Sequence, residues 1–307
     1  MPIRDVGVSL LTRRVGQGEA LLLASGTAAI EMALEILRVG PGHEVIVPDI
    51  GCHCVAAAAA RSGATVVFVG VGETLTLLPG DVLAAVTDVT RAVIGVHQYG
   101  LPADIPGIRR VVPAPVTVVE DFAQAWGLTV AGQDAGSLGD LSVTSFGQTK
   151  PLSLGAGGAL FGPRELLREV CGPDERERAR PPTGARFPLP LLPLLPDAMT
   201  AADRRVSARR YCVARIMEFM ATRGGRAAPV DPQSRPSWTR LPLYLPRTPT
   251  SEDLAGPSRF IELTQPMHDE PPSALAMFRN LPKRVVPGTS RVRDPLLVKP
   301  ADEIGDT

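Results

Sequence analysis

Residues 140–162 read DLSVTSFGQTKPLSLGAGGALFG, and this stretch governs how the rest of the chain is interpreted. The pattern predicts a buried strand at Leu141–Thr144, a polar loop, a glycine-rich turn and a second strand. The loop carries Lys150, one of only three lysines beside 29 arginines in the chain. A lysine amine can lose its proton and form a Schiff base, which an arginine guanidinium cannot do. A lone loop lysine is usually a solvated surface residue, so a chemical role for Lys150 depends on its surroundings.

The segments before this stretch alternate between strand and helix patterns. Strands are expected at 44–48, at 64–70, within 91–100 and at 116–119, and helices at 28–40, 55–63 and 81–89. Continuous Val and Ile runs that alternate with helices are typical of a parallel sheet covered on both faces. The sequence therefore predicts an α/β fold, in which ligands bind beyond the carboxyl ends of the strands.

Polar residues follow three of these strands, in HQYG at 97–100, EDFAQA at 120–125 and SFGQTK at 145–150. Because the carboxyl ends of parallel strands share one edge, these residues are expected to converge on one site. Ser25-Gly26-Thr27 precede the first helix, where Ser25 or Thr27 is the expected N-cap. Free N–H groups at such a helix start favour an anion such as phosphate, although an ordinary capped helix explains the same residues.

The composition excludes several classes of protein. The 307 residues are 44% apolar with a formal net charge of zero, which gives no bulk attraction to nucleic acid or to an anionic membrane. No apolar run approaches the ~20 residues of a membrane helix, and the first residues lack the apolar core of a signal peptide. A cytoplasmic enzyme is therefore expected.

The four cysteines do not suggest a disulfide framework in a chain of this length. Cys52-His53-Cys54 places three potential ligands side by side, but this spacing matches no structural zinc site. No metal is expected.

The regular alternation of strand and helix patterns ends near residue 172, where a charged, proline-rich connector begins. This predicts a large α/β domain at 1–172 and a small, proline-rich α+β domain at 173–307. The second part has one clear long helix at 201–225 and short strand candidates at 241–246 and 259–266. The final dozen residues are expected to be frayed.

Seven blocks of sequence, in order and with compatible spacing over roughly residues 20–165, resemble the DegT/DnrJ/EryC1/StrS family of sugar aminotransferases. They are SGTAAIEMAL, VIVPD, GATVVFV, VHQYG, VEDFAQAWG, GSLGD and SFGQTKPLSLGAGGALF. The resemblance implies the aspartate aminotransferase-like fold (PLP fold type I), with a reduced C-terminal domain, and pyridoxal 5'-phosphate as cofactor.

The resemblance also implies catalytic roles. Lys150 forms the Schiff base with the cofactor aldehyde and later moves the substrate α-proton. Asp121 sits under the pyridine nitrogen and keeps it protonated, which makes the ring an electron sink. Gln124, three residues on and on the same helical face, lies beside the phenolic oxygen of the ring. The alternatives are a helix-capping acid for Asp121 and a surface amide for Gln124.

The remaining cofactor contacts implied by the resemblance hold the phosphate and the ring. The Gly26 and Thr27 amides, the Thr27 hydroxyl and Ser145 bind phosphate. His53 stacks on the ring, although a core or surface histidine is an equally good explanation. Glycines 155, 157 and 158 bring the backbone close to the cofactor or simply form a tight turn. His97 and Tyr99 lie near the site in a structural role or in contact with substrate, and Asp140 is structural.

The chain also departs from the family pattern. Cys52 stands in register with the aromatic residue that family members stack on the ring. The Tyr-Asn-x-Arg block after the lysine is absent, with residues 183–187 as its nearest remnant, and the chain is shorter at both ends than typical members. These departures affect the substrate more than the cofactor.

The resemblance implies an aminotransferase that moves nitrogen, with glutamate as donor, to a keto-sugar nucleotide or another carbonyl acceptor, and that acts as a homodimer. Lys150 argues against the family's sugar dehydratases, which carry histidine there. Two alternatives stay open: a degenerate member that binds cofactor or a partner subunit without turnover, and a different reaction on the same cofactor.

Overall fold

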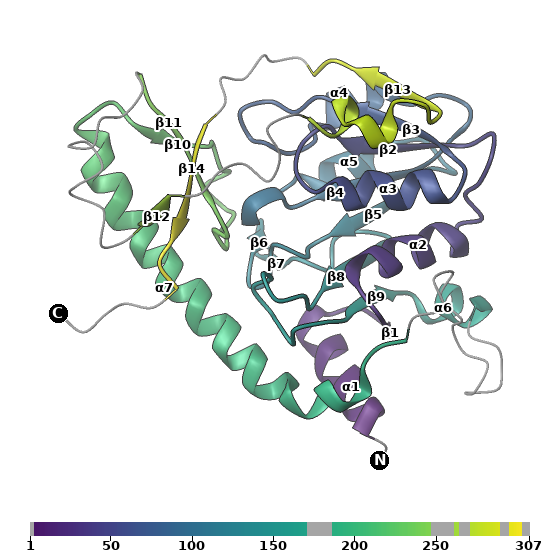
Figure 1. Ribbon diagram of the computed structural model, residues 1–307, viewed down its shortest axis with the longest axis horizontal. Helices are drawn as coiled ribbons and strands as arrows, with labels where there is room; N and C mark the ends of the chain where they lie inside the picture. Colours follow the sequence, from purple (N-terminus) through teal and green to yellow (C-terminus); the bar gives the residue numbers. More distant parts are fainter. Residues whose placement is uncertain (1–2, 171–185, 247–260, 264–270, 289–294, 303–307) are drawn as a thin grey trace.

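The computed structural model describes residues 3–170, 186–246, 261–263, 271–288 and 295–302 (Figure 1). Its main feature is an eight-stranded sheet with the strand order β1-β9-β8-β5-β4-β2-β3-β13. The strands are β1 (Glu19–Leu23), β2 (Glu44–Pro48), β3 (Thr65–Val69), β4 (Thr90–Val96), β5 (Thr117–Asp121), β8 (Leu141–Ser145), β9 (Gly158–Gly162) and β13 (Lys283–Val286). Only β9 runs against its neighbours, so the expected mostly parallel sheet is confirmed.

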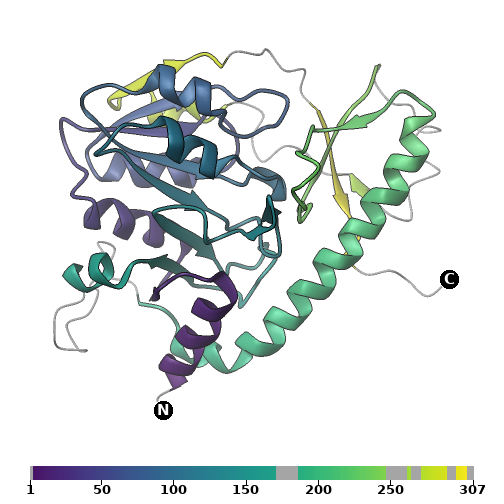
Figure 2. The ribbon, with the colours of Figure 1, turned by 180° about the vertical axis from the view of Figure 1, so that it is seen from behind.

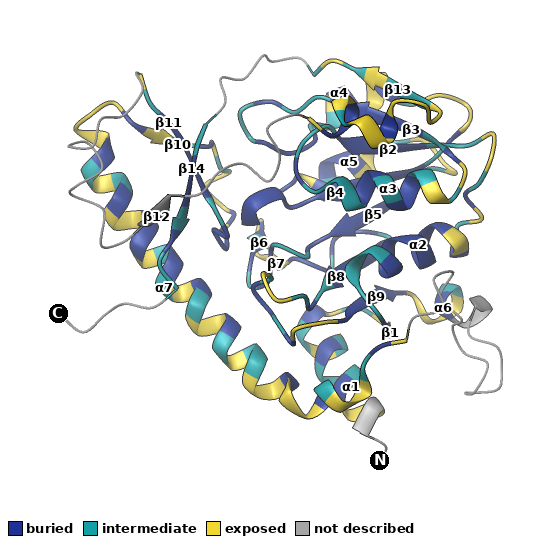
Figure 3. Cartoon of the chain, viewed as in Figure 1, coloured by how far each residue is buried: buried dark blue, intermediate teal, exposed yellow. Residues whose placement is uncertain are grey.

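Helices cover both faces of this sheet (Figures 1 and 2). One face packs on α2 (Gly26–Ile36), α3 (His53–Arg61) and α6 (Arg164–Val170). The other packs on α1 (Ile3–Val15), α4 (Pro79–Ala85) and α5 (Ile105–Val111). Most residues of the central strands are dark blue in Figure 3, because helices exclude water from both faces of the sheet. This burial explains the apolar runs in their sequences.

A second, four-stranded sheet has the order β10-β11-β14-β12. Its strands are β10 (Arg226–Ala227), β11 (Leu241–Tyr244), β12 (Ile261–Leu263) and β14 (Leu296–Pro300). The long helix α7 (Leu195–Ala221) packs on this sheet and extends back toward α1 (Figure 1). At 27 residues it is about 40 Å long, enough to connect the two sheets.

Three expectations about element boundaries were wrong. The helix expected at 81–89 runs from Pro79 to Ala85, and the long helix begins at Leu195 because Pro196 is tolerated in its first turn. Residues 296–300, expected to be frayed, form β14, which pairs with both β11 and β12.

The remaining short elements complete the description. They are β6 (Thr129–Val130), β7 (Gln133–Asp134) and the 3-10 helices η1 (Gln98–Gly100), η2 (Leu189–Leu194), η4 (Pro272–Ala274) and η5 (Ala276–Phe278). Between β12 and β14 of the second sheet, the chain contributes η4, η5 and β13 to the large sheet, where they pack beside β3. No helix within the described residues is long and apolar enough to cross a membrane.

Candidate active site

The ends of three neighbouring parallel strands, β8, β5 and β4, define the candidate active site. Their carboxyl ends bring Ser145, Asp121 and the residues after Val96 to one edge of the sheet, as the sequence predicts. The loop after β8 carries Lys150, whose N–H donates to the Gly147 carbonyl at 3.0 Å. The Lys150 charge acts on Asp121, so the predicted lysine and carboxylate lie close together.

Asp121 is a buried carboxyl group with one oxygen free. Its Oδ1 accepts a hydrogen bond from the Ala123 N–H at 2.9 Å, while Oδ2 has no hydrogen bond to any part of the chain that the structure describes. Burial raises the pKa of this carboxyl, and the Ala123 N–H and the Lys150 charge offset the rise only in part. The site thus presents a carboxyl group with one oxygen left to accept from a cationic N–H donor.

Gln124 lies in a series of turns after β5 and not on the expected helix. Its Oε1 accepts from the Tyr99 N–H at 3.3 Å, which leaves the amide NH₂ group as a donor. Its backbone carbonyl accepts from the hydroxyls of Ser237 and Thr239 at 3.3 and 3.2 Å. The loop between β10 and β11 of the second sheet therefore fixes the position of this glutamine.

The start of α2 has the features of an anion site. Ser25 is the N-cap, and its Oγ accepts from the Ala28 N–H at 3.1 Å. The first hydrogen bond within the helix runs from the Ala29 N–H to the Ser25 carbonyl. The N–H groups of Gly26 and Thr27 therefore lie before the first bond of the helix. A Cβ on Gly26 would lie 2.8 Å from the Cβ of Ser145, which places the predicted phosphate-binding residues of α2 and β8 side by side.

The glycine-rich turn packs directly on this helix start. Gly157 forms a parallel bridge with Ser25, and a side chain on Gly158 would collide with the Ser25 backbone. Gly155 and Gly157 have φ of +87° and +99°, which favour glycine. Gly158 is required because a Cβ there would collide with the backbone of Ser25 and Gly26, and the predicted approach of these glycines to the cofactor stays a prediction.

The start of α3 contributes Cys52, His53 and Cys54. Cys52 is the N-cap residue, and the Cys52 and Thr27 side chains both lower the pKa of the Cys54 thiol. His53 and Lys150 both act electrostatically on Cys54. His53 therefore lies near Thr27 and Lys150, and its stacking role stays a prediction. The described residues contain no cluster of three or more metal-ligating side chains.

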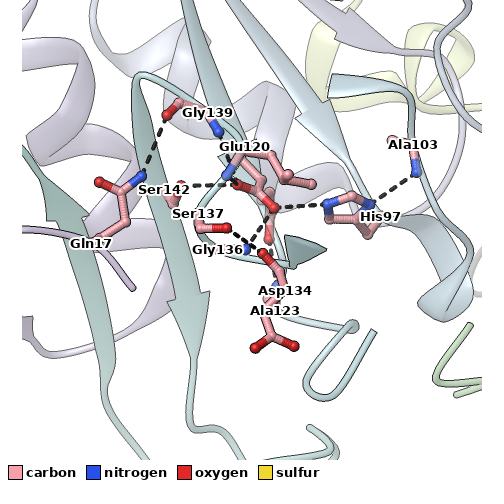
Figure 4. Close-up of polar contacts among 12 residues, drawn as sticks. Gln17, His97, Ala103, Glu120, Ala123, Asp134, Gly136, Ser137, Gly139 and Ser142 are labelled. Atoms are coloured by element: carbon pink, nitrogen blue, oxygen red, sulfur yellow. Dashed lines mark hydrogen bonds and ion pairs between the residues drawn. The ribbon is translucent and has the colours of Figure 1, made fainter. Parts of the chain in front are cut away.

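The buried residues below the site were not predicted from the sequence. Glu120 is fully buried, and its two carboxylate oxygens accept five hydrogen bonds (Figure 4). The donors are His97 Nε2 at 2.9 Å, the N–H groups of Gly136, Leu138 and Gly139 at 2.6, 2.8 and 3.0 Å, and Ser142 Oγ at 3.1 Å. Because successive strand residues point to opposite faces, this network holds the strand that presents Asp121 on its other side.

His97 has a structural role, which resolves the two alternatives left by the sequence. The ring is fully buried, its Nδ1 accepts from the Ala103 N–H at 2.9 Å, and its Nε2 faces Glu120. Asp140 is structural too, since its carboxylate accepts from Val118 N–H at 2.8 Å and from Arg109 Nη2 at 2.6 Å. Adjacent Gln98 is also buried, and its Nε2 has no hydrogen-bond partner among the described residues. Only the polar HQYG pattern after β4 pointed to this residue.

Residues 10–172, about half of the chain, match the family model described as the DegT/DnrJ/EryC1/StrS aminotransferase family. The 3-aminotransferase for UDP-N-acetyl-3-dehydro-alpha-D-glucosamine from Acidithiobacillus ferrooxidans is 45% identical over 153 residues, which cover 48% of this chain and 42% of that protein. The 3-amino-5-hydroxybenzoate synthase of Amycolatopsis mediterranei is 36% identical over 173 residues, covering 53% and 45%. The chain thus matches less than half the length of these curated relatives.

Similarity in structure extends further along the chain than similarity in sequence. The crystal structure of 3-amino-5-hydroxybenzoic acid synthase superimposes with a TM-score of 0.79 and 25% identity, covering 92% of this chain and 78% of that one. The fold is therefore that of the pyridoxal-phosphate enzymes of fold type I. The chain belongs to the DegT/DnrJ/EryC1/StrS aminotransferase family.

Pyridoxal 5'-phosphate is the cofactor of this family, as the sequence predicts. The residues at the site fit it. Asp121 offers a buried acceptor with a free oxygen for the ring nitrogen, and the start of α2 offers amides and hydroxyls to the phosphate. The individual roles of Gly26, Thr27, His53, Asp121, Gln124, Ser145 and Lys150 stay predictions.

Proposed function

We propose that this chain is a pyridoxal-phosphate-dependent aminotransferase in which Lys150 bonds to the cofactor and Asp121 pairs with the ring nitrogen. The observation that supports this most directly is the buried Asp121 carboxyl with its uncompensated Oδ2 beside the Lys150 charge. A carboxyl group in this position loses stability by burial and regains it when a protonated ring nitrogen donates to it. When bound, the cofactor supplies an electron sink for the substrate carbon.

The side chains of this chain supply binding and proton transfer. Gly26, Thr27 and Ser145 hold the phosphate, and the Gln124 amide donates to the phenolic oxygen of the ring. The Lys150 amine would take the proton from the substrate α-carbon and deliver it to the former aldehyde carbon of the cofactor, on the other side of the nitrogen that is transferred. Asp121 keeps the proton on the ring nitrogen, which the buried and rigidly held end of β5 favours.

Glutamate is the proposed amino donor, and a keto-sugar nucleotide or another carbonyl compound is the proposed acceptor. Relatives that act on keto-sugars support this acceptor class, for example the 4-aminotransferase for dTDP-4-dehydro-2,3,6-trideoxy-D-glucose of Saccharopolyspora spinosa, which is 36% identical over 145 residues. We propose a homodimer in the cytoplasm, in keeping with the resemblance to this family.

Borohydride trapping tests the proposal. Purified protein incubated with cofactor and reduced with borohydride should carry the cofactor on Lys150, as identified by peptide mass spectrometry. Glutamate added before reduction should release the label and convert the cofactor to its amine form. Lys150→Ala should abolish the label, while Lys299→Ala, which removes another of the three lysines, should leave it unchanged.

Two outcomes contradict the proposal in different ways. Labelling of Lys299 or Lys283 in place of Lys150 refutes the lysine assignment. A labelled Lys150 that no amino donor releases leaves the cofactor assignment intact and refutes transamination.

A further inference from the structure

Gln98 carries a buried hydrogen-bond donor that no described part of the chain satisfies. The residue is 1% exposed, and its Nε2 has no hydrogen-bond partner among the described residues. The residues on either side are held in place, because His97 bonds to Glu120 and the Tyr99 N–H donates to Gln124. A donor that is buried on such a fixed backbone and left unpaired costs stability, so its presence calls for a ligand that pairs with it.

The Gln98 amide lies where the chain enters α3. It packs against Gly51, on which a Cβ would collide with the amide and lie 2.6 Å from its nitrogen. Gly51 also has a φ of +86°, which favours glycine. Cys52 follows as the N-cap residue, and α3 begins at His53. The unpaired donor is therefore next to a helix N-terminus.

The start of α3 favours an anion. The N-cap residue Cys52 makes no side-chain hydrogen bond to the first turn, whereas Ser25 caps α2 by accepting from the Ala28 N–H. The helix has nine residues, and its aligned peptide dipoles favour negative charge at this end. The helix start and the unpaired Gln98 donor are independent features, and both fit a negatively charged oxygen.

This position lies on the face of the sheet that presents Asp121. Val119, two residues before Asp121 and on the same face of β5, packs with residues of α2 and α3. Gln98 follows β4 and Gly51 follows β2, and the strand order β8-β5-β4-β2 places both on the side of Asp121 away from Ser145. Because Ser145 is a proposed phosphate ligand, an anion beside Gln98 lies at different strand ends from the phosphate.

We propose that Gln98 and the first turn of α3 form a carboxylate subsite, which binds a carboxylate group of the amino donor. A carboxylate supplies the acceptor that the Gln98 amide lacks, and its charge is of the sign that the helix start favours. The identity of the amino donor rests on the proposed function, whereas the binding of a carboxylate at this place does not.

The binding of glutarate tests the subsite without any turnover. Glutarate is the five-carbon dicarboxylate that corresponds to glutamate without its amino group. Calorimetric titration of the full-length chain, with and without pyridoxal phosphate, should show binding that Gln98→Met weakens at least about tenfold, as expected for one lost hydrogen bond to a charged acceptor. Gln233→Met, at an exposed glutamine, is the matched control and should leave the affinity unchanged. A wild type that does not bind glutarate, or equal affinity in Gln98→Met, overturns the proposal.

The Tyr99 hydroxyl is the alternative acceptor for Gln98 within the chain. Burial raises the pKa of the Tyr99 phenol and the Gln98 side chain lowers it, but Gln98 Nε2 has no hydrogen bond to this hydroxyl. Thermal unfolding of the ligand-free protein separates the two cases. Methionine fills the space of glutamine without a polar group, so Gln98→Met should keep or raise the Tm. A Tm more than about 2 °C below wild type would mean that Gln98 is paired within the chain and would overturn the proposal.

A cofactor titration distinguishes a substrate carboxylate from the cofactor phosphate. Gln98→Met should change the affinity for pyridoxal phosphate by less than about twofold. A loss of affinity confined to pyridoxal phosphate would mean that the subsite holds the phosphate, which overturns the proposal.

Steady-state kinetics distinguish a failure of this inference from a failure of the proposed function. Because the carboxylate stays bound throughout the reaction, Gln98→Met should raise the KM for glutamate at least about tenfold and leave kcat nearly unchanged. An active transaminase whose glutamate KM does not respond overturns the subsite and leaves the proposed function intact. Glutarate binding that depends on Gln98, in a protein that never transaminates, upholds the subsite while the proposed activity fails.

Discussion

Replacing Glu120 with glutamine tests whether the buried network beneath Asp121 stabilises the fold. Glutamine keeps the shape of glutamate, but its NH₂ group must face either the His97 and Gly136 donors or the other three donors. The less costly orientation loses two bonds to a charged acceptor, each worth about 1.5–3 kcal/mol. The expected loss is therefore at least about 3 kcal/mol, or roughly 6 °C or more in Tm for a chain of this size.

Thermal unfolding followed by circular dichroism measures this loss. The matched control is Glu218→Gln on α7, where the carboxylate is exposed and pairs with Arg215, and its Tm should stay within about 2 °C of wild type. Ser142→Ala removes a single donor and should cost about 1 kcal/mol. A Tm of Glu120→Gln within about 2 °C of wild type would refute the reasoning.

Acid unfolding gives an independent check on the same residue. Burial alone raises the pKa of Glu120, but the His97 bond and charge and the Gly136 and Leu138 N–H groups outweigh burial and lower it. A carboxyl with a lowered folded-state pKa stabilises the protein above its unfolded pKa, near 4.3, and this contribution disappears as the pH falls through the folded-state value. The stability gap between wild type and Glu120→Gln should therefore narrow below about pH 4.

Three further predictions concern single contacts. Because burial raises the pKa of Asp121, its ionisation costs stability at neutral pH, so Asp121→Asn should raise the Tm of the cofactor-free protein at pH 8 and weaken cofactor binding in titrations. Gly26→Ala pushes a methyl group against Ser145 and should cost roughly 1–3 kcal/mol in urea unfolding, together with cofactor affinity. The half-buried pair of Glu44 with Arg284, joined at 2.9 Å, should show a coupling energy of about 1 kcal/mol in a double-mutant cycle, and a value near zero would mean that it does not anchor β13.

The parts of the fold that the sequence predicted are those in which local pattern and tertiary role agree. The central strands are buried on both faces, so their Val and Ile runs can only belong to a covered sheet. Lys150, Asp121 and Ser145 follow such strands, and parallel strands place these positions at one edge. That these residues converge on one site could therefore be predicted from their positions at strand ends, without knowledge of any contact.

The missed elements depend on pairing between distant segments. Strand β14 pairs with β11 and β12, and β13 joins β3 more than 200 residues earlier in the chain, so a short apolar run at either place carries no local sign of its partner. Glu120 was missed for a related reason. A charged residue beside Asp121 at a strand end is typical of solvent exposure, and only the loop at 136–139 folding over it shows that it is buried.

The second sheet helps to build the site, because the loop between β10 and β11 holds Gln124 in place. The hydroxyls of Ser237 and Thr239 donate to the Gln124 carbonyl, and the Gln124 side chain in turn accepts from Tyr99. Tyr99 and Trp238 have φ of +58° and +54°, a conformation that costs about 1–3 kcal/mol in a residue other than glycine. The two strained residues lie at the contact between the sheets, where the packing of one sheet against the other maintains their backbone conformation. A change that loosens the second sheet should therefore release Tyr99 and Gln124 before it disturbs Asp121, which β5 and the Glu120 network hold from below.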